Sequence, residues 1–361
     1  MGLPNIQIIF KQAGITAVTR GSRGIVALIL KDATNNGLIT MDSVADIPTT
    51  LSTYNKKQLS DAWIGGIKAP IKVIAFVEPI AATDYTAAMN ALEVTKWNYL
   101  AVPGIISTDA AIIATWVKGL RDNKDIRVKA ILPNISADHE GIINLTTNDI
   151  IVSTTTNSVV SSKTYDVAEY CARIAGLIAG TPLTMSATYQ VLSEVTDVPH
   201  LSITDFNTAI DAGKFVLMND GVKVKVARAV NSLVTTTTDK GTDYQKIKLV
   251  DIMDQIHDDM KTTIADSYTG KVPNGYDNKC ILITALLAYL EGLENDNLLD
   301  IGSTIEIDIE KQSLYLKGQG IDVTTMTAQE IKQANTADKV FIKGSVKILD
   351  AMEDFTINLG M

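Results

Sequence analysis

Four short runs rich in apolar residues, separated by segments of helical periodicity, constrain the fold of this chain more than any other feature. A strand without a polar face must be covered on both sides. The segments between the runs place apolar residues three and four apart, as with Ile112, Ile113 and Trp116. This alternation is typical of a mainly parallel sheet with helices on both faces. The predicted strands are 25–30, 72–77, 99–102 and 127–132, and the predicted helices are 55–64, 84–96 and 108–120.

The remaining patterns change after this region. A strong turn signal, Asn219-Asp220-Gly221, predicts a hairpin. The other elements predicted up to residue 230 are strands at 150–152 and 158–160, helices at 165–179 and 205–212 (the second with Thr204 as a candidate cap), and hairpin strands at 215–218 and 222–230. Those predicted beyond it are helices at 244–266, 278–294 and 327–335, a hairpin of 305–309 with 313–317, and strands at 340–349 and 355–359.

Composition excludes several classes of protein. Apolar residues make up 46% of the 361 residues and charged residues 20%, which is enough apolar surface for a large core. The net charge of −9 argues against a general nucleic-acid binder, because such proteins need a basic surface.

The first residues do not resemble a signal peptide, and the longest apolar stretch, 281–290, is too short to span a bilayer. We therefore expect synthesis in the cytoplasm and no membrane insertion.

Signatures of enzymes and metal proteins are weak. No glycine-rich phosphate loop follows a predicted strand, and no serine lies in a nucleophile elbow. His139 is expected in a surface loop, and Asp254, His257 and Asp258 on a solvated helix face, although their spacing would also suit a metal. We therefore predict no catalytic residues, no cofactor and no metal.

The N-terminal 22 residues read as a single strand followed by a polar stretch. Ile6, Ile8 and Phe10 alternate along the strand, and a segment rich in glycine, threonine and arginine follows. A lone strand before a polar stretch often pairs elsewhere, because an unpaired strand edge is prone to aggregate.

Three stretches resemble the contractile phage tail sheath family, as found in myophages and in R-type bacteriocins of Gram-positive hosts. The most specific is 226–298, with the motif V-N-S-L, the helix motif D-x-I-x-x-D-M and the linker Y-x-G-K-V-x-N-x-Y-D-N. The other two are the opening, 4–10 followed by 20–27, and the terminal segment 350–359. The resemblance is close at both ends and in the C-terminal half, whereas residues 30–200 match in pattern only.

The resemblance implies a fold and four segments. The fold class is α/β, with a Rossmann-like body and an α+β C-terminal sheath domain. The segments are an N-terminal arm (1–22), the body (23–238), the sheath domain (239–345) and a C-terminal arm (346–361). Each arm would add a β-strand to a neighbouring subunit. The arm anchors would be Ile6, Ile8, Phe10, Phe355, Ile357 and Leu359.

The resemblance also implies a mechanical function. The subunit would polymerise as stacked hexameric rings around a tail tube, with baseplate and tail terminator proteins as further partners, and would contract within a phage or bacteriocin tail. Gly14, Gly21 and Gly24 would belong to a tether between arm and body. Glu330, Lys332 and Gln333 are the candidates for contact with the tube.

Two alternatives stay open at this point. One is a Rossmann-like nucleotide-binding enzyme in residues 24–160, since fold alone does not exclude a function. The other is the sheath of a type VI or extracellular injection system.

Overall fold

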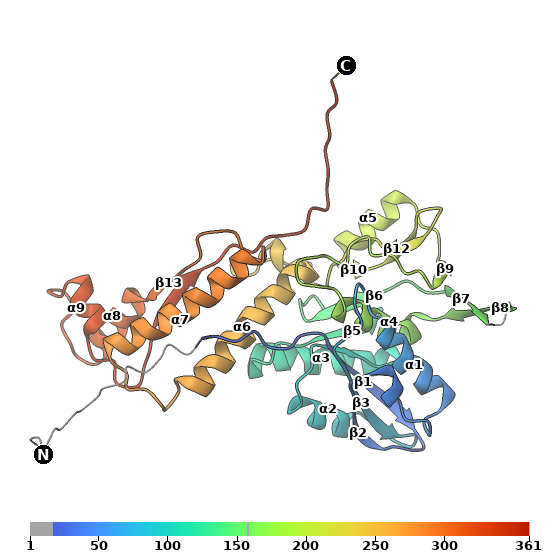
Figure 1. Ribbon diagram of the computed structural model, residues 1–361, viewed down its shortest axis with the longest axis horizontal. Helices are drawn as coiled ribbons and strands as arrows, with labels where there is room; N and C mark the ends of the chain where they lie inside the picture. The colour runs from blue at the N-terminus through green and yellow to red at the C-terminus, as the bar shows by residue number, and fades with distance from the viewer. Residues whose placement is uncertain (1–16, 157–158, 361) are drawn as a thin grey trace, which may run out of the picture. The chain divides into compact units, whose positions relative to one another are not determined.

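The computed structural model describes residues 17–156 and 159–360 of the chain (Figure 1). Within these residues the chain divides into two compact units. Unit 1 comprises residues 17–20 and Asp258–Leu349, and unit 2 comprises Gly21–His257 and 350–360. This division rests on compactness, so the domain limits at 22, 238 and 345 stay a prediction. The anchors Ile6, Ile8 and Phe10 and the tether residue Gly14 lie outside the described residues.

Unit 2 is built on a seven-stranded sheet that is parallel except at one edge, as the apolar runs predict. The edge strand β2 is antiparallel to β3, and the other neighbours are parallel. The strands β2 and β6 are short and weakly patterned, and the sequence does not predict them. In spatial order the strands are β10 (Lys214–Phe215), β6 (Ile142–Leu145), β5 (Lys129–Pro133), β4 (Tyr99–Ala101), β1 (Ile25–Asp32), β3 (Lys72–Pro79) and β2 (Gly37–Met41).

Each face of this sheet packs into its own hydrophobic cluster. Val26 and Leu28 of β1 belong to the cluster with α1 (Thr53–Ile64) and α4 (Val167–Ala179). Ala27 and Ile29 belong to the cluster with α2 (Thr86–Glu93) and α3 (Ser107–Lys124). The strand is apolar at successive positions because both of its faces are buried.

Two close approaches of the backbone depend on glycine. A Cβ added at Gly176 of α4 would lie 1.9 Å from the carbonyl oxygen of Ala62 in α1. At Gly24, which has φ +95°, a Cβ would lie 2.7 Å from the carbonyl oxygen of Ala179. Glycine at these positions lets α1, α4 and the start of β1 pack closely.

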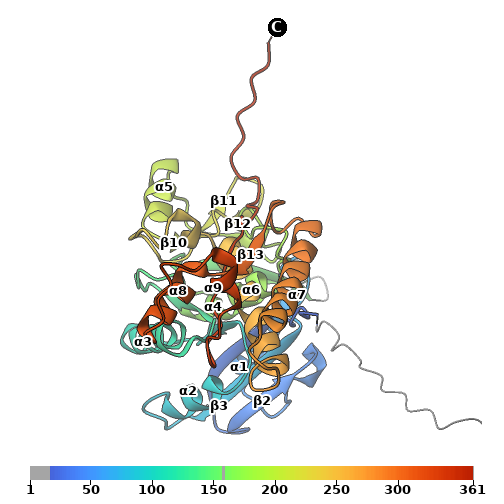
Figure 2. The ribbon, with the colours of Figure 1, turned by 90° about the vertical axis from the view of Figure 1, so that its left-hand side faces the viewer.

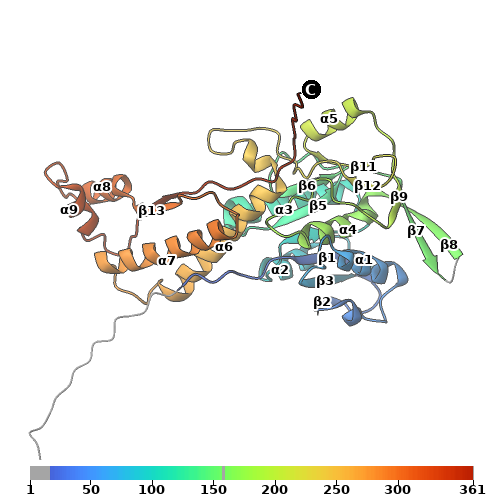
Figure 3. The same cartoon turned by 45° about the horizontal axis from the view of Figure 1, so that its top comes forward.

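The rest of unit 2 contains smaller sheets at the edge of the main one. Figures 1 and 3 show β7 and β8 as a ribbon that projects from this part of the unit. Helix α5 begins after Ser202, whose hydroxyl accepts the Asp205 N–H, so the expectation that Thr204 caps it was wrong. The elements are β7 (Ile150–Thr156), β8 (Val159–Tyr165), β9 (Val195–Asp197), α5 (Ile203–Asp211), β11 (Leu217–Asn219), β12 (Val224–Val226) and the 3-10 helices η1 (Val44–Asp46) and η2 (Thr242–Gln245).

Unit 1 combines helices with a two-stranded sheet. Helix α6 (Ile247–Ser267) begins in unit 2 and ends in unit 1, where the Tyr289 hydroxyl of α7 (Tyr276–Asn295) donates to Asp259 at 2.7 Å. In the linker between these helices, the Asn274 amide donates to the carbonyls of Ala337 and Lys339 at 2.8 and 2.9 Å. The linker motif thus orders a turn far along the chain. The other elements are β13 (Thr304–Ile307), α8 (Ile309–Gly318), α9 (Ala328–Gln333) and β14 (Ile342–Ser345).

The predicted hairpin of 305–309 with 313–317 was wrong. Strand β13 pairs with β14 instead, and the second predicted strand is helix α8. Asp308 caps that helix by accepting the Lys311 N–H at 3.0 Å, and Leu316 packs with Val323 and Ile331. The alternation of Leu314 and Leu316 resembled a strand, but Leu314 is exposed.

The contact at Gly176 predicts opposite effects for two helical glycines. Gly176→Ala should lower the free energy of unfolding by about 1–3 kcal/mol, because the methyl group overlaps the α1 backbone. Gly292→Ala in α7 is the matched control. No atom lies within 4 Å of its added Cβ, so it should raise that free energy by about 0.5–1 kcal/mol. Urea unfolding measures both, and equal effects would contradict the close approach of α1 and α4.

Candidate functional site

A group of buried charges lies at the amino ends of β4 and β5. This charge cluster consists of Arg23, Arg121, Lys129, Glu140, Asp251 and Asp254. The two aspartates come from α6, and the cations come from the segment before β1, from α3 and from β5. The side chains are at most 13% exposed. With three cations and three anions, the cluster is balanced in charge.

The geometry of the charge cluster joins α6 to the main sheet. Arg121 binds Asp254 through two N–H groups, each at 2.9 Å, and Lys129 contacts both Asp254 and Asp251. Asp251 also accepts the Tyr99 hydroxyl at 2.6 Å and pairs with Arg23. Paired and hydrogen-bonded charges of this kind are tolerated in a core, whereas single ones are very costly.

The charge cluster corrects the view of Asp254 and His257 as a solvated face. Asp254 is buried, and His257 contacts Asp125 at 2.9 Å. Burial by itself would raise the pKa of Asp254, but Lys129 and Arg121 outweigh burial and hold this pKa below its ordinary range. One signal was present in the sequence: a lysine inside the apolar strand 127–132 needs a buried partner.

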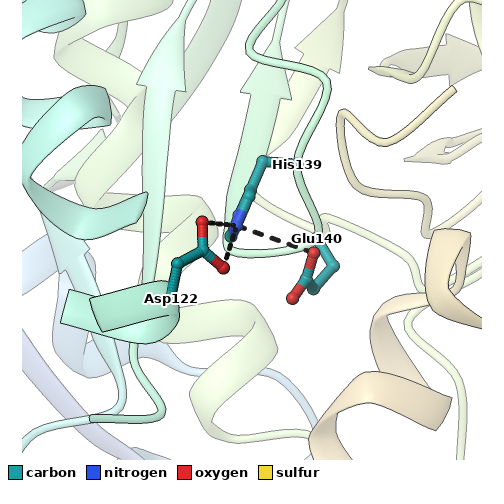
Figure 4. Close-up of side chains that lie close together, drawn as sticks. All are labelled: Asp122, His139 and Glu140. Atoms are coloured by element: carbon teal, nitrogen blue, oxygen red, sulfur yellow. Dashed lines mark hydrogen bonds and ion pairs between the residues drawn. The ribbon is translucent and has the colours of Figure 1, made fainter. Parts of the chain in front are cut away.

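His139, expected in a surface loop, is buried beside the charge cluster (Figure 4). Its Nε2 lies 3.2 Å from both oxygens of Asp122 and 3.7 Å from Glu140, a grouping that could suit a metal ion. Its Nδ1, however, accepts the Gly141 N–H at 2.9 Å. In the neutral ring the proton is then on Nε2, so this nitrogen has no lone pair for a metal. Glu140 also accepts from Lys240 at 3.0 Å, and the grouping is best described as hydrogen bonds and ion pairs.

The residues just before β1 are held by ion pairs and hydrogen bonds. Arg20 pairs with Asp296 at 2.8 Å within unit 1, and Arg23 pairs with Asp251 within unit 2. The Gly24 N–H donates to the Asn98 side chain at 3.0 Å, and the Gly21 carbonyl accepts from Gln255. Two of the three predicted tether glycines thus lie in contact with the rest of unit 2.

The C-terminal segment is held at its base and exposed beyond it. Lys246 pairs with Asp350, Arg228 donates to Asp354 at 2.6 Å, and Ser186 donates to Glu353 at 2.8 Å. Residues 350–360 form no helix or strand, and Figures 1 and 2 show their outer part running away from the other elements of unit 2. Phe355, Ile357 and Leu359 are 69%, 75% and 87% exposed. Pairing of this segment as a strand stays a prediction.

The sheet of β13 and β14 has two open edges within the described residues. Its strands pair only with each other. Beside β14 lies a groove of about 620 Å³. Its apolar lining consists of Ile264, Val272, Pro273, Leu282, Val340 and Ile342. Unit 1 therefore offers both backbone hydrogen-bonding groups and apolar surface to an added strand.

The three candidates for a tube contact lie on α9, a short helix that packs on α8 through Ile331. Glu330 is exposed, but its carboxylate accepts the Thr327 N–H and hydroxyl and so caps the helix. Lys332 is half-buried and Gln333 is exposed. Their role as a tube contact stays a prediction.

The cavity in which an open α/β sheet usually binds a nucleotide is poorly suited to a phosphate group in this protein. The strand order changes direction between β1 and β4, and ligands in open α/β sheets bind outside the carboxyl ends at such a point. The cavity there, about 430 Å³, is lined by Lys31, Tyr54, Tyr85 and Asp109, among others, and the Lys31 ammonium donates to the Ala82 carbonyl at 3.0 Å. Asp109 lies in the first turn of α3, where a phosphate would meet its negative charge. In the part of the chain that is described, no helix is long and apolar enough to cross a bilayer.

Comparison with known proteins gives consistent matches over the whole chain. Residues 78–232 match the family model of the phage tail sheath protein central domain, and 239–361 that of the phage tail sheath C-terminal domain. The tail sheath protein of Clostridium phage phiCD119 is 39% identical over 367 aligned residues, covering 100% of this chain and 99% of that protein.

Two solved structures have a similar fold. The helical sheath of the anti-feeding prophage in its contracted state matches with a TM-score of 0.73 and 13% identity, covering 100% of this chain and 99% of that one. The sheath tail protein of Desulfitobacterium hafniense matches with a TM-score of 0.69 and 17% identity, covering 84% of this chain and 94% of that one.

The charge cluster predicts a large cost for removing one charge. Asp254→Asn should lower the free energy of unfolding by about 3–5 kcal/mol, because Arg121 and Lys129 lose a buried partner. The control is Lys124→Ala, which removes the exposed pair with Glu93 and should cost about 0–1 kcal/mol. Comparable costs in chemical denaturation would show that the charge cluster does not fix α6.

The buried His139 predicts a loss of stability in mild acid. Burial lowers its pKa below the ordinary value of 6.5, despite Glu140 and Asp122. The unfolded chain then binds the proton more readily, so stability is complete above about pH 6.5 and declines as the pH falls below it. His139→Gln cannot titrate and should show a flatter dependence between pH 7.5 and 5. Unfolding measured across this range is the test, and identical slopes would exclude His139 as the cause.

Proposed function

Because this chain belongs to the phage tail sheath protein family, as a structural subunit of a contractile sheath, we propose that it polymerises by exchanging terminal strands between subunits. The polymer consists of stacked hexameric rings around a tail tube. Contraction of the rings drives the tube through the envelope of a target cell. The subunit carries no catalytic residues and needs no cofactor or metal for this work.

One observation supports the proposal: the described residues include an exposed apolar terminal segment and a small sheet whose outer edges are unpaired. The exposed apolar side chains of Phe355, Ile357 and Leu359 alternate as in a strand. The sheet of β13 and β14 has open edges beside an apolar groove. A strand donated from one copy to the next is a heterologous contact, which propagates into rings or helices.

Burial of the arm anchors supplies the association energy. An apolar side chain gains about 1.5–3 kcal/mol when it is fully buried, so three anchors give several kcal/mol for each arm. Ile6, Ile8 and Phe10 of the N-terminal arm, residues 1–22, have the same alternation in sequence. The C-terminal arm, 346–361, is held at its own subunit by Asp350, Glu353 and Asp354, so only residues beyond 354 need to be donated.

The contacts at the start of β1 make the proposed tether of the N-terminal arm shorter than the sequence suggests. Arg20 and Arg23 are both held by ion pairs, which supports a free tether that ends before Arg20. Gly14 then belongs to the tether, whereas Gly21 and Gly24 set the entry into β1. Since a stretched residue spans at most about 3.6 Å, the tether length limits how far neighbouring subunits separate while their strands stay paired.

The other partners are the tail tube, the baseplate and the tail terminator. We propose that Lys332 and Gln333 of α9 contact the tube, with Glu330 holding the helix in shape. Exposed polar pairs are worth only about 0–1 kcal/mol each, so such a contact releases easily on contraction. Contraction itself is a switch between two packings of the subunits. The protein is made in the host cytoplasm and functions in a virion or bacteriocin tail, without nucleic acid or membrane insertion.

Two finer assignments belong to the same proposal. The parallel strands follow the order β3-β1-β4-β5-β6, a doubly wound order of the flavodoxin type, which supports a body that is Rossmann-like in the broad sense. The domain limits at 22, 238 and 345 are part of the same proposal. The alternative of a nucleotide-binding enzyme is disfavoured by Asp109 at the expected phosphate position. The sheath of an injection system shares the fold, and the 39% identity with a phage tail sheath protein favours a phage-type particle.

Substitution of the C-terminal anchors tests the proposal. The triple variant Phe355→Ser, Ile357→Ser and Leu359→Ser should fold with unchanged unfolding free energy and lose polymerisation, because its exposed anchors contribute only between subunits. The matched control, Thr356→Ala with Asn358→Ala, changes the opposite side of the same segment and should polymerise normally. Sedimentation and electron microscopy measure the polymers. Regular sheaths formed by the triple variant would exclude donation of this arm.

A further inference from the structure

A cavity of about 640 Å³ lies at the edge of the main sheet of unit 2. The residues after β5 and β6 form its floor, the edge strand β10 forms one side, and α5 forms a wall with Asp205, Thr208 and Ala209. Ligands of open α/β sheets bind at these carboxyl ends. Seven of its fifteen lining residues carry an amide or a hydroxyl group, six are apolar, and the other two are Asp205 and Lys214.

The register of the sheet brings two polar side chains together in this cavity. Lys214 of β10 is the parallel partner of Asn144 in β6, so both side chains lie on the same face of the sheet. The next pair, Phe215 and Leu145, is fully buried in the core of the opposite face. On the same face the neighbouring strand places the apolar Leu132 beside Asn144, and the cavity begins where Asn144 and Lys214 follow this apolar residue.

Both polar side chains lack a good partner. Asn144 is 1% exposed, its Oδ1 has no hydrogen bond, and its Nδ2 reaches only the Ser136 hydroxyl at 3.5 Å. An unpaired buried amide costs about 1–3 kcal/mol. Lys214 is half-buried, and no described residue forms an ion pair or hydrogen bond with its ammonium group. A buried amide and a cation side by side thus leave hydrogen-bonding capacity unused.

The unused capacity favours an acceptor with negative charge. Lys214 supplies three N–H donors, and the amide of Asn144 can turn to present its own N–H groups. Asp205 is the acidic residue among the described lining residues, and its carboxylate already accepts the Ser202 hydroxyl at 2.7 Å at the cap of α5. Planar carboxylates bind well to such a set of converging donors.

We propose that this cavity is a carboxylate-binding site in which Lys214 supplies the charge and Asn144 an amide N–H. The carboxylate comes from an acidic side chain of a second copy or from a small free carboxylic acid. The chain has 41 acidic against 32 basic residues, so acidic side chains are in excess on neighbouring copies. A carboxylate from a second copy requires the proposed polymer, whereas the carboxylate-binding site itself does not depend on it.

The first experiment tests the site on the full-length protein before assembly. Malonate, titrated at constant ionic strength and followed by calorimetry, should bind, and the neutral acetamide should not. Lys214→Met should weaken malonate binding about ten-fold or more, the loss of a charge-assisted hydrogen bond. Asn144→Asp should abolish binding because its own carboxylate takes the place of the ligand. Lys214→Arg keeps the charge and should retain binding, and Lys68→Met, an exposed lysine elsewhere in unit 2, should change nothing.

The second experiment identifies the source in the assembled protein. A carbodiimide activates a carboxylate, and a lysine amine in contact with it then displaces the urea and forms an amide. Polymers made from mixed ¹⁴N- and ¹⁵N-labelled copies are coupled in this way and digested for mass spectrometry. Crosslinks from Lys214 that join a light and a heavy peptide would identify a second copy as the source.

The outcomes separate the site from its source and from the proposed strand exchange. Mixed-label crosslinks at Lys214 support a second copy, and malonate binding without them supports a free carboxylate. The proposal is overturned if malonate binds no better than acetamide and Lys214 couples no more than Lys68. Loss of polymers in the arm variant leaves the malonate result unaffected, so failure of strand exchange and failure of this site are distinguishable.

Discussion

The pairing of Asp251 and Asp254 with Lys129, Arg121 and Arg23 is the interaction on which the described structure depends most. It fixes the first half of α6 at the amino ends of β4 and β5, and α6 is the helix that continues into unit 1. Buried ion pairs need good geometry and further hydrogen bonds to offset the cost of removing the charges from water. The charge cluster meets this need within unit 2, where it joins the first half of α6 to the strands of the main sheet.

The amino ends and the carboxyl ends of the strands in the main sheet carry different side chains. At the amino ends, the charged side chains are buried and paired, and they join α6 to the sheet. At the carboxyl ends, Asn144 and Lys214 lie beside a cavity without good partners. Unit 1 shows the same contrast between satisfied and unsatisfied groups, because its small sheet keeps open edges while Asn274 and Tyr289 are paired. Both proposals place a partner at unused hydrogen-bonding capacity of this kind.

Local sequence patterns failed where a side chain's partner is distant along the chain. His139 was expected at the surface and Asp254 in solvent, and both are buried because their partners come from other elements. Residues 313–317 alternate like a strand, yet the cap at Asp308 and the burial of Leu316 make them a helix. A period of two and a period of 3.6 are hard to separate over five residues. In each case the deciding contact involves a residue outside the pattern.

The sequence by itself determined the mainly parallel sheet, its helices and the family, since continuous apolar strands, helical periodicity and long motifs are local properties of the chain. It also predicted that Phe355, Ile357 and Leu359 would share one side if the terminal segment forms a strand. Only the tertiary structure decided that Asp251 and Asp254 meet Lys129, that β13 pairs with β14, and that Lys214 lies beside Asn144. The physical reason is that charge pairing and strand register depend on distances between residues that the chain brings together only when it folds.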